Sequence, residues 1–183
     1  MWTECWTRSI RDIFSRRKKW SSCVESGYEA NNTNRSKGHG MNNLRSTLQS
    51  GGTLVGSWLQ TASPAVAELM AACGFDFLTI DAEHSAVSLP QAQMLLQAIR
   101  AGNPQCAGLV RMAGNEYDQT KQYLDAGADG VIAPLVNTVA QAEELIAAGK
   151  YPPQGRRGVG FCRANLFGKE FDSYIASANE QTL

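Results

Sequence analysis

The chain has 183 residues, of which 43% are hydrophobic and 19% are charged, and its formal net charge is zero. This length suits one domain, since domains commonly contain roughly 100–150 residues, and the composition is that of an ordinary soluble globular protein. The sequence contains no run of about 18 apolar residues, so it predicts no membrane-spanning helix. Its five cysteines lack CxxC spacing, which favours the reduced thiols of a cytoplasmic protein over a disulfide framework or a zinc site.

Residues 1–40 differ in character from the rest of the chain. They hold eight Lys/Arg and four Asp/Glu, a net charge of +4, which the remaining nine basic and thirteen acidic residues balance. Four apolar residues fall at helical spacing ahead of a basic cluster: Trp6, Ile10, Ile13 and Phe14. The polar stretch 21–40 that follows is predicted to be poorly ordered. The segment is therefore predicted to be disordered or partly helical.

Three interpretations of residues 1–40 are open. The segment is a basic amphipathic helix that contacts a membrane or nucleic acid, or a targeting segment, or an extension upstream of a true start at Met41. Glu4 and Asp12 disfavour a targeting segment, because transit peptides are poor in acidic residues. We favour the extension, and expect neither a membrane nor a nucleic-acid partner.

From Met41 onward the sequence predicts a repeated strand–helix unit. Short apolar runs rich in β-formers predict four strands, at residues 53–59, 77–80, 109–112 and 130–133. A helix with its own start signal follows each strand: Ser63-Pro64, the capping box Ser88–Gln91, Asn115, and the capping box Thr138–Gln141. This alternation is the βαβ pattern of a parallel sheet.

Two α/β architectures are compatible with four such units. One is an incomplete (β/α)₈ TIM barrel comprising about the first four βα units, since a complete barrel takes roughly 250 residues and residues 41–183 supply 143. The other is a four-stranded open sheet of flavodoxin-like type. The sequence has neither a GxGxxG motif nor a P-loop, so nucleotide binding has little support.

Asp81, Glu83 and His84 follow the second predicted strand directly. Parallel α/β folds place their reactive groups at the carboxyl ends of the strands. A carboxylate three residues before a histidine can hold the imidazole in one tautomer and leave its other nitrogen free as a base. The alternative is an aspartate that caps a turn beside an ordinary surface histidine.

Arg111 lies at the end of the third predicted strand, one residue before Met112, and Trp58 lies near the end of the first. The arginine would present a permanently charged fork to the same edge of the sheet as His84, where it suits a carboxylate or a developing enolate oxygen. It could also form a salt bridge to Asp81 or Glu83, and the two roles are compatible. Trp58 is either an apolar wall of the site, and so a substrate contact, or a core residue.

Three segments together resemble the HpcH/HpaI aldolase family: GSWLQTASPAVAELMAACGFDFLTIDAEH, LVRMAGNEYDQTKQYLDAGADGVIAPLVNT and YPPQGRRGVGFCRANLFG. The similarity extends from about Leu44 to the end of the chain and corresponds to roughly the N-terminal half of a family member. It therefore implies that residues 41–183 form the first half of a TIM-barrel aldolase domain.

The resemblance also implies an activity. Members of this family are class II, metal-dependent pyruvate aldolases of the 4-hydroxy-2-oxoheptanedioate and 2-dehydro-3-deoxyglucarate type, which release pyruvate and an aldehyde from a small 4-hydroxy-2-oxo acid. His84 matches the catalytic histidine, Asp81 the carboxylate that orients it, and Arg111 the arginine that contacts the pyruvate oxygen. A divalent metal (Mg, Mn or Co) and a homo-oligomer are implied for a full-length member.

The sequence departs from the family pattern at the metal site. The family's metal ligands are a glutamate and a later aspartate that we expect beyond Leu183, and Glu83 would approach a metal at most through water. An incomplete barrel would also leave two unpaired sheet edges. The alternative function is therefore a truncated, catalytically inactive fragment that acts at most as an interaction module, and we expect this chain itself not to bind the metal.

Overall fold

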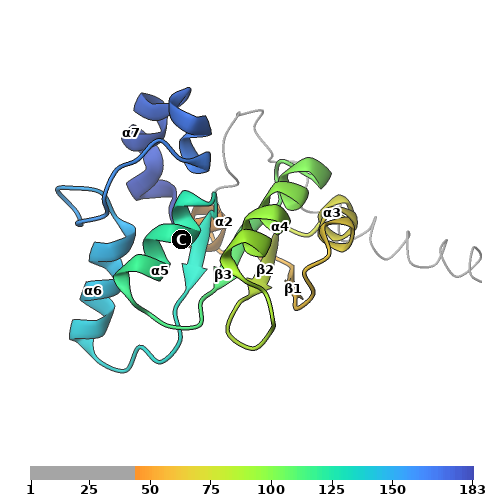
Figure 1. Ribbon diagram of the computed structural model, residues 1–183, viewed down its shortest axis with the longest axis horizontal. Helices are drawn as coiled ribbons and strands as arrows, with labels where there is room; N and C mark the ends of the chain where they lie inside the picture. Colours follow the sequence, from red (N-terminus) through yellow and green to blue (C-terminus); the bar gives the residue numbers. More distant parts are fainter. Residues whose placement is uncertain (1–43) are drawn as a thin grey trace, which may run out of the picture. The chain divides into compact units, whose positions relative to one another are not determined.

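The computed structural model describes residues 44–183, and the predictions for residues 1–40 lie outside this part (Figure 1). Four strands alternate with helices in it: α2 (Leu44–Gln49), β1 (Gly56–Leu59), α3 (Pro64–Ala72), β2 (Phe77–Asp81), α4 (Leu89–Gly102), β3 (Ala107–Arg111), α5 (Tyr117–Asp125), β4 (Gly130–Ile132), α6 (Val139–Gly149), the 3₁₀ segment η2 (Arg163–Gly168) and α7 (Phe171–Gln181). Within residues 44–183, no helix is both long and apolar enough to cross a membrane.

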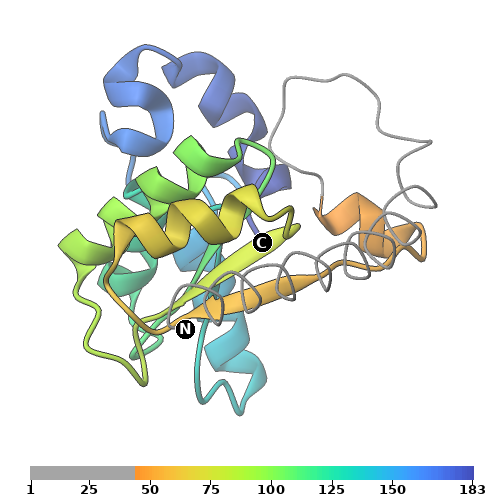
Figure 2. The same cartoon turned by 90° about the vertical axis from the view of Figure 1, so that its right-hand side faces the viewer.

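The four strands form one parallel sheet in the order β1-β2-β3-β4. This order follows the chain without reversal, whereas a flavodoxin-like sheet reverses its strand order at a switch point. Helices α3 and α4 cover the same face of the sheet (Figure 2), and residues of α3, α4 and α5 belong to one apolar cluster with the strands. The structure therefore confirms the prediction of an incomplete barrel, and its strand order excludes the flavodoxin-like alternative.

The core lies between the sheet and these helices. Leu59, Ile80 and Val110 lie side by side in register on β1, β2 and β3, and each is at most 1% exposed. Their side chains pack with Ala67 of α3 and Leu95 of α4. Full burial of each large aliphatic side chain contributes about 1.5–3 kcal/mol, so this row of side chains is a main source of the fold's stability.

The helix start signals are confirmed at three of the four helices. Ser63 precedes Pro64 at the start of α3, and capping boxes precede α4 and α6 as predicted. The prediction for α5 was wrong, because its N-cap is Glu116; the Asn115 amide instead donates to the carbonyl of Pro134 (3.5 Å). A start signal in the sequence thus located this helix to within one residue.

All four strands differ from the predicted bounds, β2 and β4 by only one residue at their ends, Asp81 and Ile132. β1 begins three residues later than predicted, since the backbone N–H of Val55 donates to the Asp76 carboxylate (2.9 Å). β3 begins two residues earlier, at Ala107, and ends at Arg111 instead of Met112. The second shift places Arg111 at the last position of the strand.

The outer edge of β4 is partly paired, which corrects the expectation of two open edges. Leu183 donates its N–H to the carbonyl of Asp129 and accepts from the N–H of Val131, both at 3.1 Å. This is the parallel bridge pattern, with Leu183 opposite Gly130. Arg45 and Lys150 both donate to the carbonyl of Thr182, at 2.9 and 3.2 Å, and so hold the end of α7 beside β4.

Candidate active site

Polar side chains form one row across the carboxyl ends of three neighbouring strands. Asp81 and Arg111 are register partners at the ends of β2 and β3, and Gln60 follows the last residue of β1. Side chains alternate between the two faces of a strand, so this row lies on the face opposite Leu59, Ile80 and Val110. The helices cover the aliphatic row, and the polar row lies on the other face.

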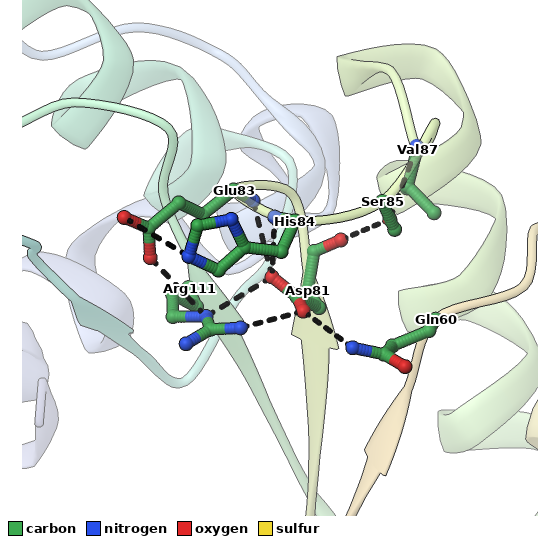
Figure 3. Close-up of polar contacts among 7 residues, drawn as sticks. All are labelled: Gln60, Asp81, Glu83, His84, Ser85, Val87 and Arg111. Atoms are coloured by element: carbon green, nitrogen blue, oxygen red, sulfur yellow. Dashed lines mark hydrogen bonds and ion pairs between the residues drawn. The ribbon is translucent and has the colours of Figure 1, made fainter.

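Asp81 is the centre of the row. Its side chain is fully buried, and its carboxylate accepts hydrogen bonds from five donors (Figure 3). The donors are Arg111 Nε (3.0 Å) and Nη2 (2.6 Å), Gln60 Nε2 (3.0 Å), and the backbone N–H groups of Glu83 (3.1 Å) and His84 (3.0 Å). The fork of Arg111, the largest influence, holds the pKa of Asp81 well below its usual range, although burial opposes it.

The predicted contact between Asp81 and the imidazole of His84 is not formed. The carboxylate binds the backbone N–H of His84, and its remaining acceptor positions are occupied by Arg111, Gln60 and Glu83. Asp81 therefore orders the loop that carries His84 and anchors the arginine fork. Its participation in catalysis stays a prediction.

Gln60 was missed by the sequence analysis. Its amide nitrogen donates to Asp81, although the residue lies 21 positions earlier in the chain. The signal that could have located it is its place directly after the first predicted strand, because the ends of parallel strands meet at one edge of the sheet.

Arg111 lies between Asp81 and Trp58. Besides the two bonds to Asp81, its Nε is 3.4 Å from Glu83 Oε2, so the salt bridges considered from the sequence are present. Its guanidinium carbon lies 4.6 Å from the centre of the Trp58 ring, which is a cation–π contact. Trp58 is 47% exposed, so the alternative of a core residue was wrong. Arg111 thus has a fixed position with three neighbours.

His84 extends outward from the row. Its side chain is 67% exposed, and its Nε2 lies 3.7 Å from Glu83 Oε1. The Glu83 side chain, at 21% exposure, lies between the histidine and the arginine (Figure 3). The structure therefore brings together all five residues singled out from the sequence, and it leaves their roles in substrate binding and catalysis as predictions.

The described residues do not fit a divalent metal. A magnesium-type ion takes several oxygen ligands in near-octahedral geometry. Asp81 already accepts five hydrogen bonds, and Glu83 lies within ion-pair distance of Arg111. Across residues 44–183 there is also no group of three or more His, Cys, Asp or Glu side chains arranged to hold an ion.

Residues 54–183 match the family model described as HpcH/HpaI aldolase/citrate lyase, so the chain belongs to this family. A 4-hydroxy-2-oxovalerate aldolase from Novosphingobium aromaticivorans is 39% identical over 141 residues, which cover 77% of this chain and 53% of that protein. A hydroxypyruvate/pyruvate aldolase from Roseobacter denitrificans is 38% identical, with 78% and 55% covered.

A solved structure agrees with these relatives. The crystal structure of an HpcH/HpaI aldolase/citrate lyase family protein from Burkholderia cenocepacia superposes with a TM-score of 0.72 at 33% identity, covering 78% of this chain and 57% of that one. The family resemblance seen in the sequence is thereby confirmed. The chain spans about half the length of the curated relatives it matches.

Proposed function

We propose that this chain provides the catalytic edge of a pyruvate aldolase that cleaves a 4-hydroxy-2-oxo acid to pyruvate and an aldehyde. Family membership supports an aldolase or lyase broadly, and the two relatives named above carry aldolase names. The main support for the proposal is the guanidinium of Arg111, which the fully buried Asp81 holds in place. The exposed side chain of His84 lies in the same site. A fixed positive charge next to a base suits a reaction that forms an enolate.

In the proposed reaction His84 removes the proton from the C4 hydroxyl of the substrate. The C3–C4 bond breaks, the C4 carbon leaves as the aldehyde, and the electron pair moves into the enolate of pyruvate. Arg111 uses Nε and Nη2 to bind Asp81, so Nη1 is the nitrogen that Asp81 leaves available to the developing oxyanion. Protonation of the enolate at C3 then gives pyruvate. A single donor at such an oxyanion is worth roughly 10²–10³ in rate.

Trp58 would bind the substrate from the side of β1. Its ring is exposed and lies against the guanidinium of Arg111, so it forms an apolar wall beside the charge. A substrate that contacts Arg111 would therefore pack its carbon chain against the indole. The identity of the aldehyde stays open in this proposal, which extends only to small 2-oxo acids.

The proposal includes a divalent metal and a homo-oligomer for the complete protein, as the family resemblance implies. Because the described donors do not fit the metal, no step above is assigned to it. We expect the 183-residue chain to bind Mn²⁺ only weakly, since a single carboxylate leaves such an ion largely hydrated. Calorimetric titration with MnCl₂ tests this, and micromolar affinity would contradict the expectation.

A second proposal is that the 183-residue polypeptide is an interaction module without aldolase activity. The specific observation in its favour is the outer edge of β1, which has no partner strand among the described residues. Unpaired strand edges recruit other strands. Light scattering by the purified chain tests this proposal, and a monodisperse monomer would count against it.

One experiment separates the two proposals. Pyruvate formation is followed for the 183-residue chain and for a fusion of residues 44–183 to the part of the Novosphingobium relative that the match does not cover, each with its His84→Ala variant. We expect pyruvate from the fusion and none from its variant. A folded fusion that releases no pyruvate from any 4-hydroxy-2-oxo acid would contradict the aldolase proposal, and pyruvate release by the 183-residue chain itself would contradict the module.

A further inference from the structure

Glu83 lies between the two residues to which the proposed reaction assigns chemistry. Its carboxylate directs one oxygen to each of them: Oε1 is 3.7 Å from His84 Nε2, and Oε2 is 3.4 Å from Arg111 Nε. In Figure 3 the carboxylate is seen between the imidazole and the guanidinium. One side chain thus contacts both the candidate base and the candidate oxyanion donor.

The position of Glu83 is fixed at both ends. Its backbone N–H donates to Asp81 Oδ1 (3.1 Å), and Asp81 itself is fully buried at the end of β2. Its carboxylate is within ion-pair distance of Arg111, which Asp81 holds through two bonds. The carboxylate is therefore placed before any substrate arrives, as a positioning residue must be.

The imidazole of His84 has no comparable anchor of its own. Its side chain is 67% exposed, and Glu83 is its one ion-pair partner among the described residues. Asp81 binds the backbone of His84 and leaves the ring alone. The charged groups around the imidazole are thus Glu83, the buried Asp81 and Arg111, and of these Glu83 has an atom within 4 Å of a ring nitrogen.

We propose that Glu83 is the positioning residue of His84, holding the proton of the imidazole on Nε2 and leaving Nδ1 as the nitrogen that takes the substrate proton. The assignment of Nδ1 as the base rests on the proposed function, whereas the pairing with Glu83 does not. An ionised carboxylate can only accept a hydrogen bond, so it pairs with the ring nitrogen that carries the proton and leaves the other nitrogen as the acceptor. The distance of 3.7 Å exceeds a hydrogen bond, and such contacts commonly tighten when the substrate binds.

The pairing also has a consequence for the reaction. When Nδ1 takes the hydroxyl proton of the substrate, the imidazole becomes positively charged, and the Glu83 carboxylate then faces a full positive charge. Arg111 binds the other oxygen of the same carboxylate, so the base and the oxyanion donor are linked through one side chain. A carboxylate in this position stabilises the charged form of the base.

The test uses ¹⁵N NMR of the 183-residue chain, which has only two histidines, His39 and His84. Long-range ¹H–¹⁵N spectra at about pH 9, where imidazoles are neutral, report which ring nitrogen carries the proton. We expect His84 to be the Nε2–H tautomer in the wild-type chain, and to gain a share of the Nδ1–H tautomer in Glu83→Met. Glu83→Gln, whose amide oxygen can still accept from Nε2–H, is expected to keep most of the wild-type population.

Matched controls exclude indirect effects. Glu68→Met removes an exposed glutamate from α3, a helix on the face of the sheet opposite the polar row, and should leave the His84 spectrum unchanged. The His39 signals are the internal reference, and the amide fingerprint reports whether each variant folds. A wild-type tautomer population in a folded Glu83→Met chain would overturn the proposal. Because this readout needs no aldolase activity, a failure of the proposed function would be seen separately, in the pyruvate assay.

Discussion

The two faces of the sheet use the same strands for different purposes. On the helix-covered face, Leu59, Ile80 and Val110 lie in one register row and are at most 1% exposed. One residue further along each strand, Gln60, Asp81 and Arg111 form a row of hydrogen bonds on the opposite face. Stability and site chemistry are therefore separated by a single residue, because side chains alternate along a strand. Substitutions on the two faces should have different effects.

The largest expected effect is on the covered face. Ile80→Ala deletes methyl and methylene groups from a fully buried side chain, so we expect it to lower the free energy of unfolding by about 2–5 kcal/mol. Ile132→Ala at the end of β4 is the matched control, because Ile132 is 37% exposed and should cost much less. Urea denaturation of both variants measures the difference, and equal losses would show that the core does not lie on this face.

Arg111→Ala tests the opposite face. In the active fusion we expect kcat/KM for retro-aldol cleavage to fall about 10²–10³-fold, because a charged donor at the enolate oxygen is lost. Arg111→Lys keeps the charge but loses the fork that binds Asp81, so its kcat/KM should lie between those of the wild type and Arg111→Ala. Steady-state kinetics with pyruvate detection decides this. Wild-type turnover by the alanine variant would remove Arg111 from the mechanism.

The sequence predicted the elements whose signals are local. Capping boxes and the Ser63-Pro64 start located α3, α4 and α6, and strand ends brought Asp81 and Arg111 together as expected. Partners that depend on three-dimensional packing were not predictable in this way. Gln60, which follows β1, donates to Asp81 at the end of the neighbouring strand β2. The Asp81 carboxylate is bound by five donors that come together only in the folded chain.

The parts of the chain that lack such signals were missed for a related reason. Helix α7 begins at Phe171, and its N-cap residue Glu170 forms no side-chain cap hydrogen bond. The segment η2 includes Leu166 and Phe167 at positive φ, which no local pattern of large apolar residues predicts. The place of Leu183 beside Gly130 depends on Lys150 and on the course of α7. Long-range contacts, not local propensity, determine these segments.

A smaller effect is expected in acid. The pKa of Asp81 is lower in the folded chain than its ordinary value of 3.8, so the unfolded chain binds the proton more readily. The resulting stabilisation, on the order of 2 kcal/mol, is complete above about pH 5 and declines as the pH falls through the unfolded-state value toward the folded-state pKa. Urea denaturation between pH 2.5 and 7 should show this decline in the wild type and a weaker one in Asp81→Asn. Parallel curves would mean that Asp81 is not the titrating group.

The smallest expected effect concerns Trp58. Trp58→Leu removes the ring that lies 4.6 Å from the Arg111 guanidinium but keeps an apolar side chain. An exposed cation–π contact is worth about 0.5–1 kcal/mol, so the unfolding free energy should fall by no more than this amount. In the fusion, KM for the 2-oxo acid should rise more than kcat falls. A loss as large as that of Ile80→Ala would place Trp58 in the core after all.

The most direct test of the separation between the two faces is His84→Ala, measured for both stability and activity in the same preparation of the fusion. The His84 side chain is 67% exposed, and its one ion pair among the described residues is with Glu83, so its removal should change the unfolding free energy by less than about 0.5 kcal/mol. Pyruvate release should nevertheless fall by at least about 10²-fold, since the proposed base is gone. Near-wild-type pyruvate release by the folded variant would contradict the account.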